Sequence, residues 1–181
     1  MKERPIIFNT EMVRAILDGR KTQTRRVMNP KPFHYDGMWM WNKCAWGAVS
    51  NVPTPEVMCP YGIAGDRLWV RETFCKTGKA KPIFNIEYKA SADHFHCKWI
   101  SPIHMPKWAS RITLEIKNIR VEKIQDISEQ DAKAEGVKPL LPVADVRYKA
   151  AFQKLWDSIN ATRGFSWESN PWVWVIEFKK L

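Results

Sequence analysis

The sequence has no long apolar stretch. The first residues, Met1–Pro5, lead into only three apolar residues, Ile6–Phe8, and no later run approaches the roughly 20 residues that a membrane-spanning helix needs. A charged start followed by so short an apolar segment is also unlike a secretory signal peptide. We therefore expect a cytoplasmic protein with no membrane partner.

Cysteine is scarce as well. The chain has 4 cysteines, none in a C-x-x-C spacing, and its 181 residues can bury a core without covalent staples, so we expect no disulfide framework. His94, His96 and Cys97 are three potential zinc ligands, but their spacing matches no familiar zinc pattern. We expect no metal ion and no other cofactor, with a structural zinc ion as the minor alternative.

Acidic residues are outnumbered by basic ones. There are 19 aspartates and glutamates against 29 lysines and arginines, which gives a net charge of +10, and tryptophan occurs 10 times. Excess positive charge favours anionic partners, and indole rings offer flat faces on which bases stack. RNA or a nucleoside is therefore the expected partner. The length fits one domain over residues 1–181.

Strand-like and helix-like segments follow one another without a regular βαβ order. Extended patterns cover residues 6–8, 22–27, 68–74, 83–88, 112–119 and 172–178, and helical patterns cover 10–17, 128–136 and 143–160. This order argues against a doubly wound parallel sheet. It predicts an α+β fold, a mostly antiparallel sheet or barrel with about three short helices.

Three details of this pattern make specific predictions. The nearly all-apolar residues 172–178 predict a central strand, and a shift in alternation near Asn118 predicts a β-bulge. Residues 29–60 and 75–106, with approximate bounds, are two long insertions. The first is rich in proline and has no sustained period, so we expect it to be irregular.

The densest chemical signal is the basic run from Arg20 to Arg26. The apolar residues of 10–17 fall on one face of a helix that Asn9 or Thr10 can cap. Gly19 follows that helix, where a left-handed C-terminal cap is usual. The basic run therefore begins where a helix ends and continues as an extended segment.

Four separated pieces of the chain resemble the ASCH domain, a β-barrel family related to the RNA-handling PUA and YTH domains. The pieces are residues 10–26, 65–70, 127–136 and 174–178, in the order of the family. The resemblance implies a PUA-like barrel over residues 1–181. The longer form seen here, with its two insertions, is similar to proteins of tailed phages and prophages.

Small bacterial members of this family include amidohydrolases that remove the acetyl group from N4-acetylcytidine. Their lysine and threonine stand in a G-x-K-x-x-T motif, which Lys21 and Thr24 match. Their glutamate is matched by Glu135, with Glu129 as a competitor. The resemblance implies that Lys21, Thr24 and Glu135 are catalytic. A threonine hydroxyl needs a base, and a lysine serves as one only where burial or nearby cations lower its pKa.

A second set of residues is expected to bind phosphate or stack on bases. It comprises Arg20, Arg25, Arg26, Trp69, Trp108 and Arg111, with Trp39, Trp41 and Trp46 of the first insertion as further stacking candidates. Two other functions stay open: a non-catalytic module that binds RNA or a modified base, and a metal-independent ribonuclease with a histidine as acid or base. A charge cluster that only faces solvent is the remaining alternative.

Overall fold

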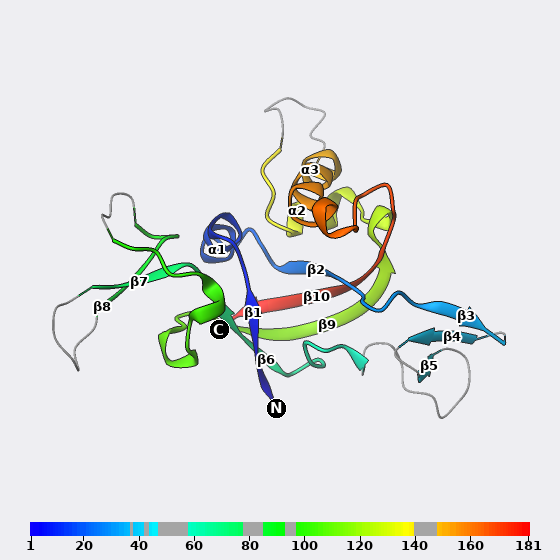
Figure 1. Cartoon of the computed structure of the whole chain (residues 1–181), viewed down its shortest axis with the longest axis horizontal. Helices are drawn as coiled ribbons and strands as arrows, with labels where there is room; N and C mark the ends of the chain where they lie inside the picture. Colours follow the sequence, from blue (N-terminus) through cyan, green and yellow to red (C-terminus); the bar gives the residue numbers. More distant parts are fainter. Residues whose placement is uncertain (37, 42–43, 47–57, 78–84, 93–96, 140–147) are drawn as a thin grey trace.

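The computed structural model describes residues 1–36, 38–41, 44–46, 58–77, 85–92, 97–139 and 148–181. Its centre is a five-stranded sheet in the order β1-β6-β9-β10-β2 (Figure 1). The strands are β1 (Glu3–Ile7), β2 (Gln23–Val27), β6 (Arg67–Arg71), β9 (Thr113–Lys123) and β10 (Trp172–Lys180). β1 and β6 are parallel, and each other neighbouring pair is antiparallel. The prediction of an α+β fold with a mostly antiparallel sheet is confirmed.

β10 is a central strand, as its apolar sequence predicts, and lies between β9 and β2. Within Val173–Ile176, the even-numbered residues join the larger apolar cluster and the odd-numbered residues pack under the helices. Each is at most 1% exposed, and burying such a side chain stabilises the fold by about 1.5–3 kcal/mol. The register against β9 shifts between Glu177 and Phe178, opposite Asn118 and Ile116, which confirms the predicted bulge.

The described residues contain three α-helices and several 3-10 helices. They are α1 (Thr10–Leu17), α2 (Glu129–Ala134), α3 (Tyr148–Asn160), η2 (Pro102–His104), η3 (Lys107–Ala109), η4 (Ile124–Asp126) and η5 (Ala161–Arg163). Asn9 caps α1 by accepting from the N–H of Met12 at 2.8 Å, and Ser128 caps α2. α2 and α3 lie together on one side of the sheet (Figure 1). Among the described helices, none has the length and apolar character to cross a membrane.

The two insertions carry strands of their own and project from opposite ends of the molecule (Figure 1). The first holds the antiparallel sheet of β3 (Phe33–Tyr35), β4 (Met38–Trp41) and β5 (Cys44–Trp46), and the second holds the hairpin of β7 (Phe74–Thr77) and β8 (Asn85–Tyr88). The prediction of an irregular first insertion is therefore wrong for these strands, because they are too short to show a sustained period. The predicted strand 68–74 is interrupted between β6 and β7.

A disulfide joins Cys75 of β7 to Cys97. This corrects the expectation drawn from cysteine spacing, which failed because the fold of the second insertion, and not a short motif, brings the two residues together. Cys97 is thereby no longer a candidate metal ligand, and His94 and His96 lie outside the described residues. The part of the chain that the structure describes holds no group of three or more potential metal ligands.

Gly136 determines how closely the end of α2 approaches the segment after α1. Its φ is +81°, and a Cβ there would lie 2.8 Å from the Cβ atoms of Ala15 and Lys21. The N–H of Thr22 donates to the carbonyl of Ala134 at 2.9 Å across the same contact. A residue without a side chain therefore lets two segments far apart in sequence meet at their backbones.

We expect Gly136→Ala to destabilise the fold more than Gly164→Ala. Gly164 has nearly the same φ, +82°, but a Cβ there meets nothing within 4 Å. Gly164→Ala should lower the free energy of unfolding by about 1–2 kcal/mol, because alanine is disfavoured in the left-handed conformation. Gly136→Ala also creates steric overlap, which should lower the free energy of unfolding by about 1–3 kcal/mol more. Urea unfolding measures both losses, and equal losses would contradict the close approach.

Candidate functional site

The backbone brings the basic segment to the end of α2. α1 ends where the N–H of Gly19 donates to the carbonyl of Ile16 at 3.1 Å, with Gly19 at a φ of +72°. The chain then turns, and Lys21 forms an isolated antiparallel bridge with Glu135. The predicted helix end at Gly19, followed by an extended segment, is confirmed. These two helix ends place Lys21 and Glu135 face to face.

Lys21, Glu135 and Arg25 form a buried charge cluster. The Nζ of Lys21 donates to Oε2 of Glu135 at 2.6 Å and to the Glu135 carbonyl at 2.9 Å. Nη1 of Arg25 donates to the other carboxylate oxygen, Oε1, at 3.1 Å. The side chains of Lys21 and Arg25 are 0% exposed and that of Glu135 is 2% exposed. One buried carboxylate thus forms ion pairs with two cations that are shielded from solvent.

Arg25 has further acidic partners. Its Nε and Nη2 donate to Oε1 of Glu122 at 2.8 and 2.6 Å, and Nη2 lies 3.5 Å from Oδ2 of Asp131. This charge balance allows a guanidinium to be buried, because an unpaired ion in a dry interior is strongly unfavourable. The contacts also mean that Arg25, predicted to bind substrate, is already engaged with the protein itself.

Burial lowers the pKa of Lys21 below its usual value of 10.5, because the ammonium loses its hydration. The positive charges of Arg26 and Arg25 lower the pKa further, while Glu135 opposes the shift. The net shift in the pKa of Lys21 is downward, because desolvation is the largest of these effects. A lowered pKa makes the neutral amine, the form that can accept a proton, more accessible.

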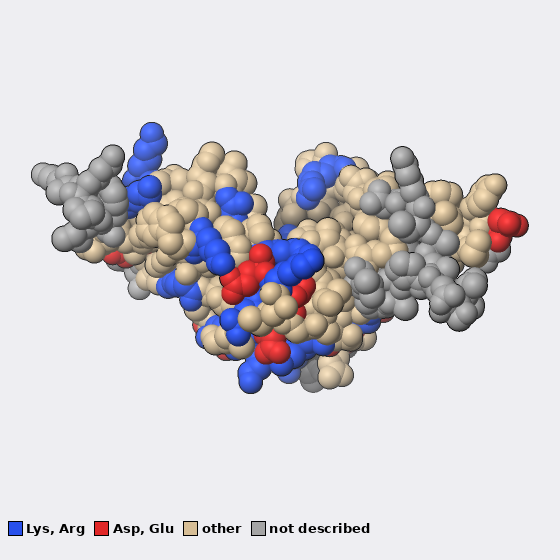
Figure 2. All heavy atoms as spheres, turned by 90° about the horizontal axis from the view of Figure 1, so that it is seen from below, with Lys and Arg blue, Asp and Glu red and all other residues tan. Residues whose placement is uncertain are grey.

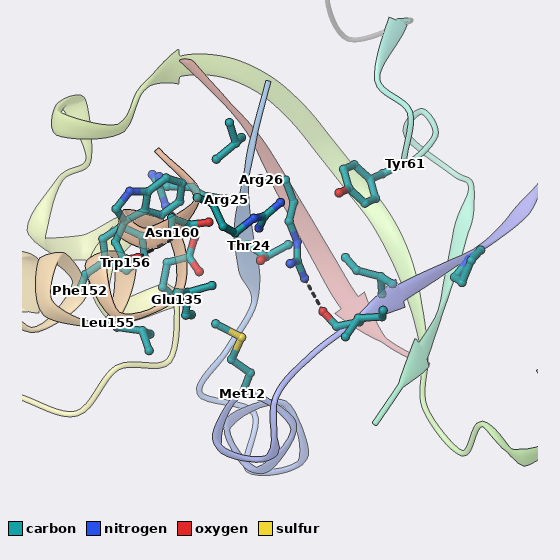
Figure 3. Close-up of a pocket in the computed structure, with 16 residues that line it drawn as sticks. Met12, Thr24, Arg25, Arg26, Tyr61, Glu135, Phe152, Leu155, Trp156 and Asn160 are labelled. Atoms are coloured by element: carbon teal, nitrogen blue, oxygen red, sulfur yellow. Dashed lines mark hydrogen bonds and ion pairs between the residues drawn. The ribbon is translucent and has the colours of Figure 1, made fainter. Parts of the chain in front are cut away.

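A cavity of about 430 Å³ opens beside this cluster, between β1, α1, β2 and α3 (Figure 3). The polar side chains that line it include Thr24, Arg25, Arg26, Glu135, Asn160 and Arg163. Phe152, Leu155 and Trp156 form an apolar side, and Tyr61 faces them from across the cavity (Figure 3). The described lining contains Thr24 and Glu135 but not Lys21, which lies behind Glu135.

The structure pairs two residues of the predicted catalytic set, Lys21 and Glu135, and places the third, Thr24, in the wall of the cavity that Glu135 also lines. Thr24 is 2% exposed and shares the cavity wall with Glu135, which contacts Lys21 directly. Glu129, the competing candidate, is exposed at the start of α2, where its Oε2 accepts from the N–H of Lys149. Catalytic roles for Lys21, Thr24 and Glu135 stay a prediction.

The predicted binding residues divide into two groups. Arg26 lines the cavity, and Arg20 lines a second pocket of about 280 Å³ that shares Glu135 with it. Trp69, Trp108 and Arg111 are absent from the described linings of both pockets. The first group is thus placed to touch a ligand bound beside Glu135, and the second is not.

The residues away from the cavity have other surroundings. Arg111 makes two hydrogen bonds to the carboxylate of Glu72, at 2.9 and 3.0 Å, and lies over the ring of Tyr88. Trp69 is half-buried and Trp108 is 66% exposed. Arg111 therefore has a structural ion pair, whereas Trp108 offers an open indole face.

The tryptophans of the first insertion also differ from one another. Trp41 is buried and donates its Nε1–H to the carbonyl of Pro30 at 2.7 Å, so it is a core residue. Trp39 is 37% exposed and packs edge-on against Trp172. The side chain of Trp46 lies outside the described residues. Of these three stacking candidates, Trp39 is the one described as exposed.

The positive charge is not gathered in the middle of the face shown in Figure 2. There, lysines and arginines lie among aspartates and glutamates. Ion pairs between the two kinds are numerous in the structure; examples are Glu3 with Arg67 and Lys107, and Glu115 with Lys117. Many individual lysines and arginines are therefore paired with carboxylates, while the excess of basic residues gives the net charge of +10. A cation in the cavity is more informative than that total.

Several residues of the cavity were not among the sequence-predicted site residues. The largest group comes from α3 and η5: Phe152, Leu155, Trp156, Ile159, Asn160 and Arg163. Their spacing is that of one helical face, and its apolar part predicts a helix that packs on a core. The signal that could have identified the site is the continuation of this stripe into two polar residues, Asn160 and Arg163.

We expect Glu135→Gln to destabilise the protein strongly. The change leaves the buried charges of Lys21 and Arg25 without their shared carboxylate, and breaking such a pair costs about 3–5 kcal/mol. Glu129→Gln, on the exposed start of the same helix, is the control and should change stability by about 0.5 kcal/mol or less. Chemical denaturation measures both, and a near-neutral Glu135→Gln would show that the pair is not formed in solution.

Comparisons with known proteins add one likeness of fold. No family model matches the chain, and no curated protein sequence matches it. A solved structure that resembles it is the crystal structure of an ASCH domain from Lactobacillus crispatus JV V101. The likeness has 12% identity and a TM-score of 0.44, and covers 99% of this chain and 79% of that chain. At this level it carries no argument about function, so the site has to be judged by its own geometry.

Proposed function

We propose that the protein hydrolyses an amide on a modified nucleoside, of the kind present in N4-acetylcytidine, in the cavity beside Glu135. One observation carries the proposal: a carboxylate in the cavity wall holds a fully buried lysine amine, and a threonine hydroxyl lines the same cavity. The motif resemblance of Lys21 and Thr24 to the small amidohydrolases supports the same reaction.

The reaction assigns a role to each of the three side chains. The hydroxyl oxygen of Thr24 attacks the amide carbonyl, and its proton passes through the carboxylate of Glu135, which lines the same cavity, to the neutral amine of Lys21. The carbonyl carbon–nitrogen bond then breaks, and Glu135, which lies between Lys21 and the cavity, transfers this proton to the departing exocyclic amine. Water hydrolyses the acyl-threonine, which releases acetate and restores the hydroxyl.

The shape of the cavity suits a nucleoside. Its volume of about 430 Å³ falls within the usual range for small-molecule sites. The aromatic rings of Trp156 and Tyr61 line it from opposite sides and offer faces for a base, while the side-chain amide of Asn160 lies beside Trp156 (Figure 3). A planar base can therefore occupy the apolar part of the cavity while its acylated amine faces Thr24.

The two alternative functions, a ribonuclease and a non-catalytic binding module, make different demands on the lining of the cavity. The described lining contains no histidine, so a ribonuclease that uses histidine as acid or base gains no support from the cavity. A non-catalytic module would use the same aromatic and cationic lining to hold RNA or a modified base. It differs from the hydrolase in one outcome, binding without turnover.

We expect the wild-type protein to release cytidine from N4-acetylcytidine, and Lys21→Met and Thr24→Val to lower kcat/KM by about 10²-fold or more. Each change removes a proton-transfer or nucleophilic group and keeps a similar side-chain volume. Thr22→Val, on the exposed part of the same segment, is the matched control and should leave the rate unchanged. Release is followed by chromatography, with circular dichroism to verify folding. No release by the wild type, or equal rates in all variants, would refute the hydrolase.

The rate should also rise with pH. Lys21 accepts a proton only when neutral, and burial lowers its pKa below 10.5, so kcat/KM should increase through that lowered pKa and then level off. The measurement is a pH–rate profile taken from neutral pH up to the ordinary lysine value of 10.5. In Lys21→Met this ascending limb should be lost. A limb that persists in the variant would assign the base to another group.

A further inference from the structure

Arg26 differs from the other cations of the basic segment in its surroundings. Arg20 contacts Asp18, Lys21 contacts Glu135, and Arg25 contacts three carboxylates. For Arg26 the structure shows one hydrogen bond, from Nη2 to the carbonyl of Ile7 at 2.6 Å, and no carboxylate within ion-pair distance among the described residues. Its Nε is buried without a hydrogen-bond partner among them.

A half-buried guanidinium with a buried, unused Nε–H donor is unfavourable unless something else compensates its charge. Arginine does not lose its proton in proteins, so it cannot escape this penalty by becoming neutral. Burial lowers the pKa of Arg26, which is another sign that its charge is poorly compensated. The side chain lies 5.1 Å from the ring centroid of Phe8, a contact that offsets only part of a full charge.

A second arginine, Arg163, lines the same cavity from η5. It also has no ion pair with a carboxylate among the described residues, and its charge is near enough to disfavour the charged form of Arg26. Two cations that repel each other across a cavity are stabilised together by an anion between them. Tyr61 directs its hydroxyl into the same space (Figure 3). The described wall of the cavity therefore carries three arginines, Arg25, Arg26 and Arg163, against the one carboxylate of Glu135.

We propose that Arg26 and Arg163 bind a phosphate group, so that this cavity prefers a nucleotide or an RNA phosphate to a free nucleoside. The inference rests on the proposed function in that the nucleoside part of the ligand occupies the same cavity. Arginine suits phosphate because its planar donors match two phosphate oxygens at once. Two arginines match the two negative charges of a phosphate monoester.

The test compares the binding of cytidine and cytidine 5′-monophosphate by titration calorimetry, without turnover. The wild type should bind the monophosphate at least about tenfold more tightly, because charge-assisted hydrogen bonds are strong. Arg163→Gln and Arg26→Gln should each reduce this preference to about threefold or less. Arg67→Gln, which removes a half-buried arginine on β6 outside the cavity, should leave this preference unchanged. Arg163 is exposed, so its variant should fold even if Arg26→Gln does not.

Each outcome decides the proposal. No detectable binding of the monophosphate, equal affinity for the two ligands, or a preference that survives in Arg163→Gln overturns it. A short single-stranded RNA that binds more tightly than the monophosphate, with the same dependence on Arg163, identifies an internal phosphodiester as the ligand; weaker RNA binding identifies a terminal phosphate. If the phosphate preference holds and N4-acetylcytidine is not hydrolysed, only the hydrolase falls. If hydrolysis occurs without the preference, only the phosphate site falls.

Discussion

The candidate site depends on one buried contact, the ion pair of Lys21 with Glu135. Two ions in a dry interior lose their hydration, and their attraction compensates for this only when the geometry is good and the remaining donors and acceptors are satisfied. Here the ammonium has a carboxylate oxygen at 2.6 Å and a carbonyl at 2.9 Å, while Arg25 occupies the other carboxylate oxygen. The contact also requires the left-handed turns at Gly19 and Gly136, which end the two helices where the residues meet. The ion pair therefore depends both on compensation of the buried charges and on the two left-handed backbone turns.

Charges of opposite sign alternate outward from that pair. Glu135 contacts Arg25, Arg25 contacts Glu122, and Glu122 contacts Arg120 near the surface. These cations are neutralised within the protein, and the network ties β2 to β9 and to the end of α2. Successive residues of a strand point in opposite directions, so Arg26 lies outside the network that holds Arg25 and contacts no carboxylate among the described residues. A basic run that looks uniform in sequence thus contains one arginine held by carboxylates next to one that has no carboxylate partner among the described residues.

This division also shows what the sequence could predict. The helix after Asn9 and the central strand at 172–178 were predictable because capping and apolar alternation are properties of neighbouring residues. The proximity of Lys21 and Glu135 was suggested only by the family motif, since the two residues are far apart in the chain. The capture of Arg25 by its carboxylates could not be predicted, because the topology of the sheet selects those partners. The apolar period of α3 predicted the helix, but a period does not say whether a face packs on a core or lines a cavity.

β2 and the two residues that precede it bury an unusual set of side chains. Within Lys21–Arg25, four of five residues are polar or charged and at most 5% exposed, while the neighbouring strand β10 fills its buried positions with apolar side chains. Packing does not require such a choice, because apolar residues of similar size often replace a buried ion pair without loss of stability or with a gain. Gln23 needs the carbonyl of Asp131 to satisfy its amide, and Arg26 leaves a buried donor unsatisfied. Departures from good packing concentrate at functional sites. The ligand proposed for the cavity would account for the free energy given up along this one strand.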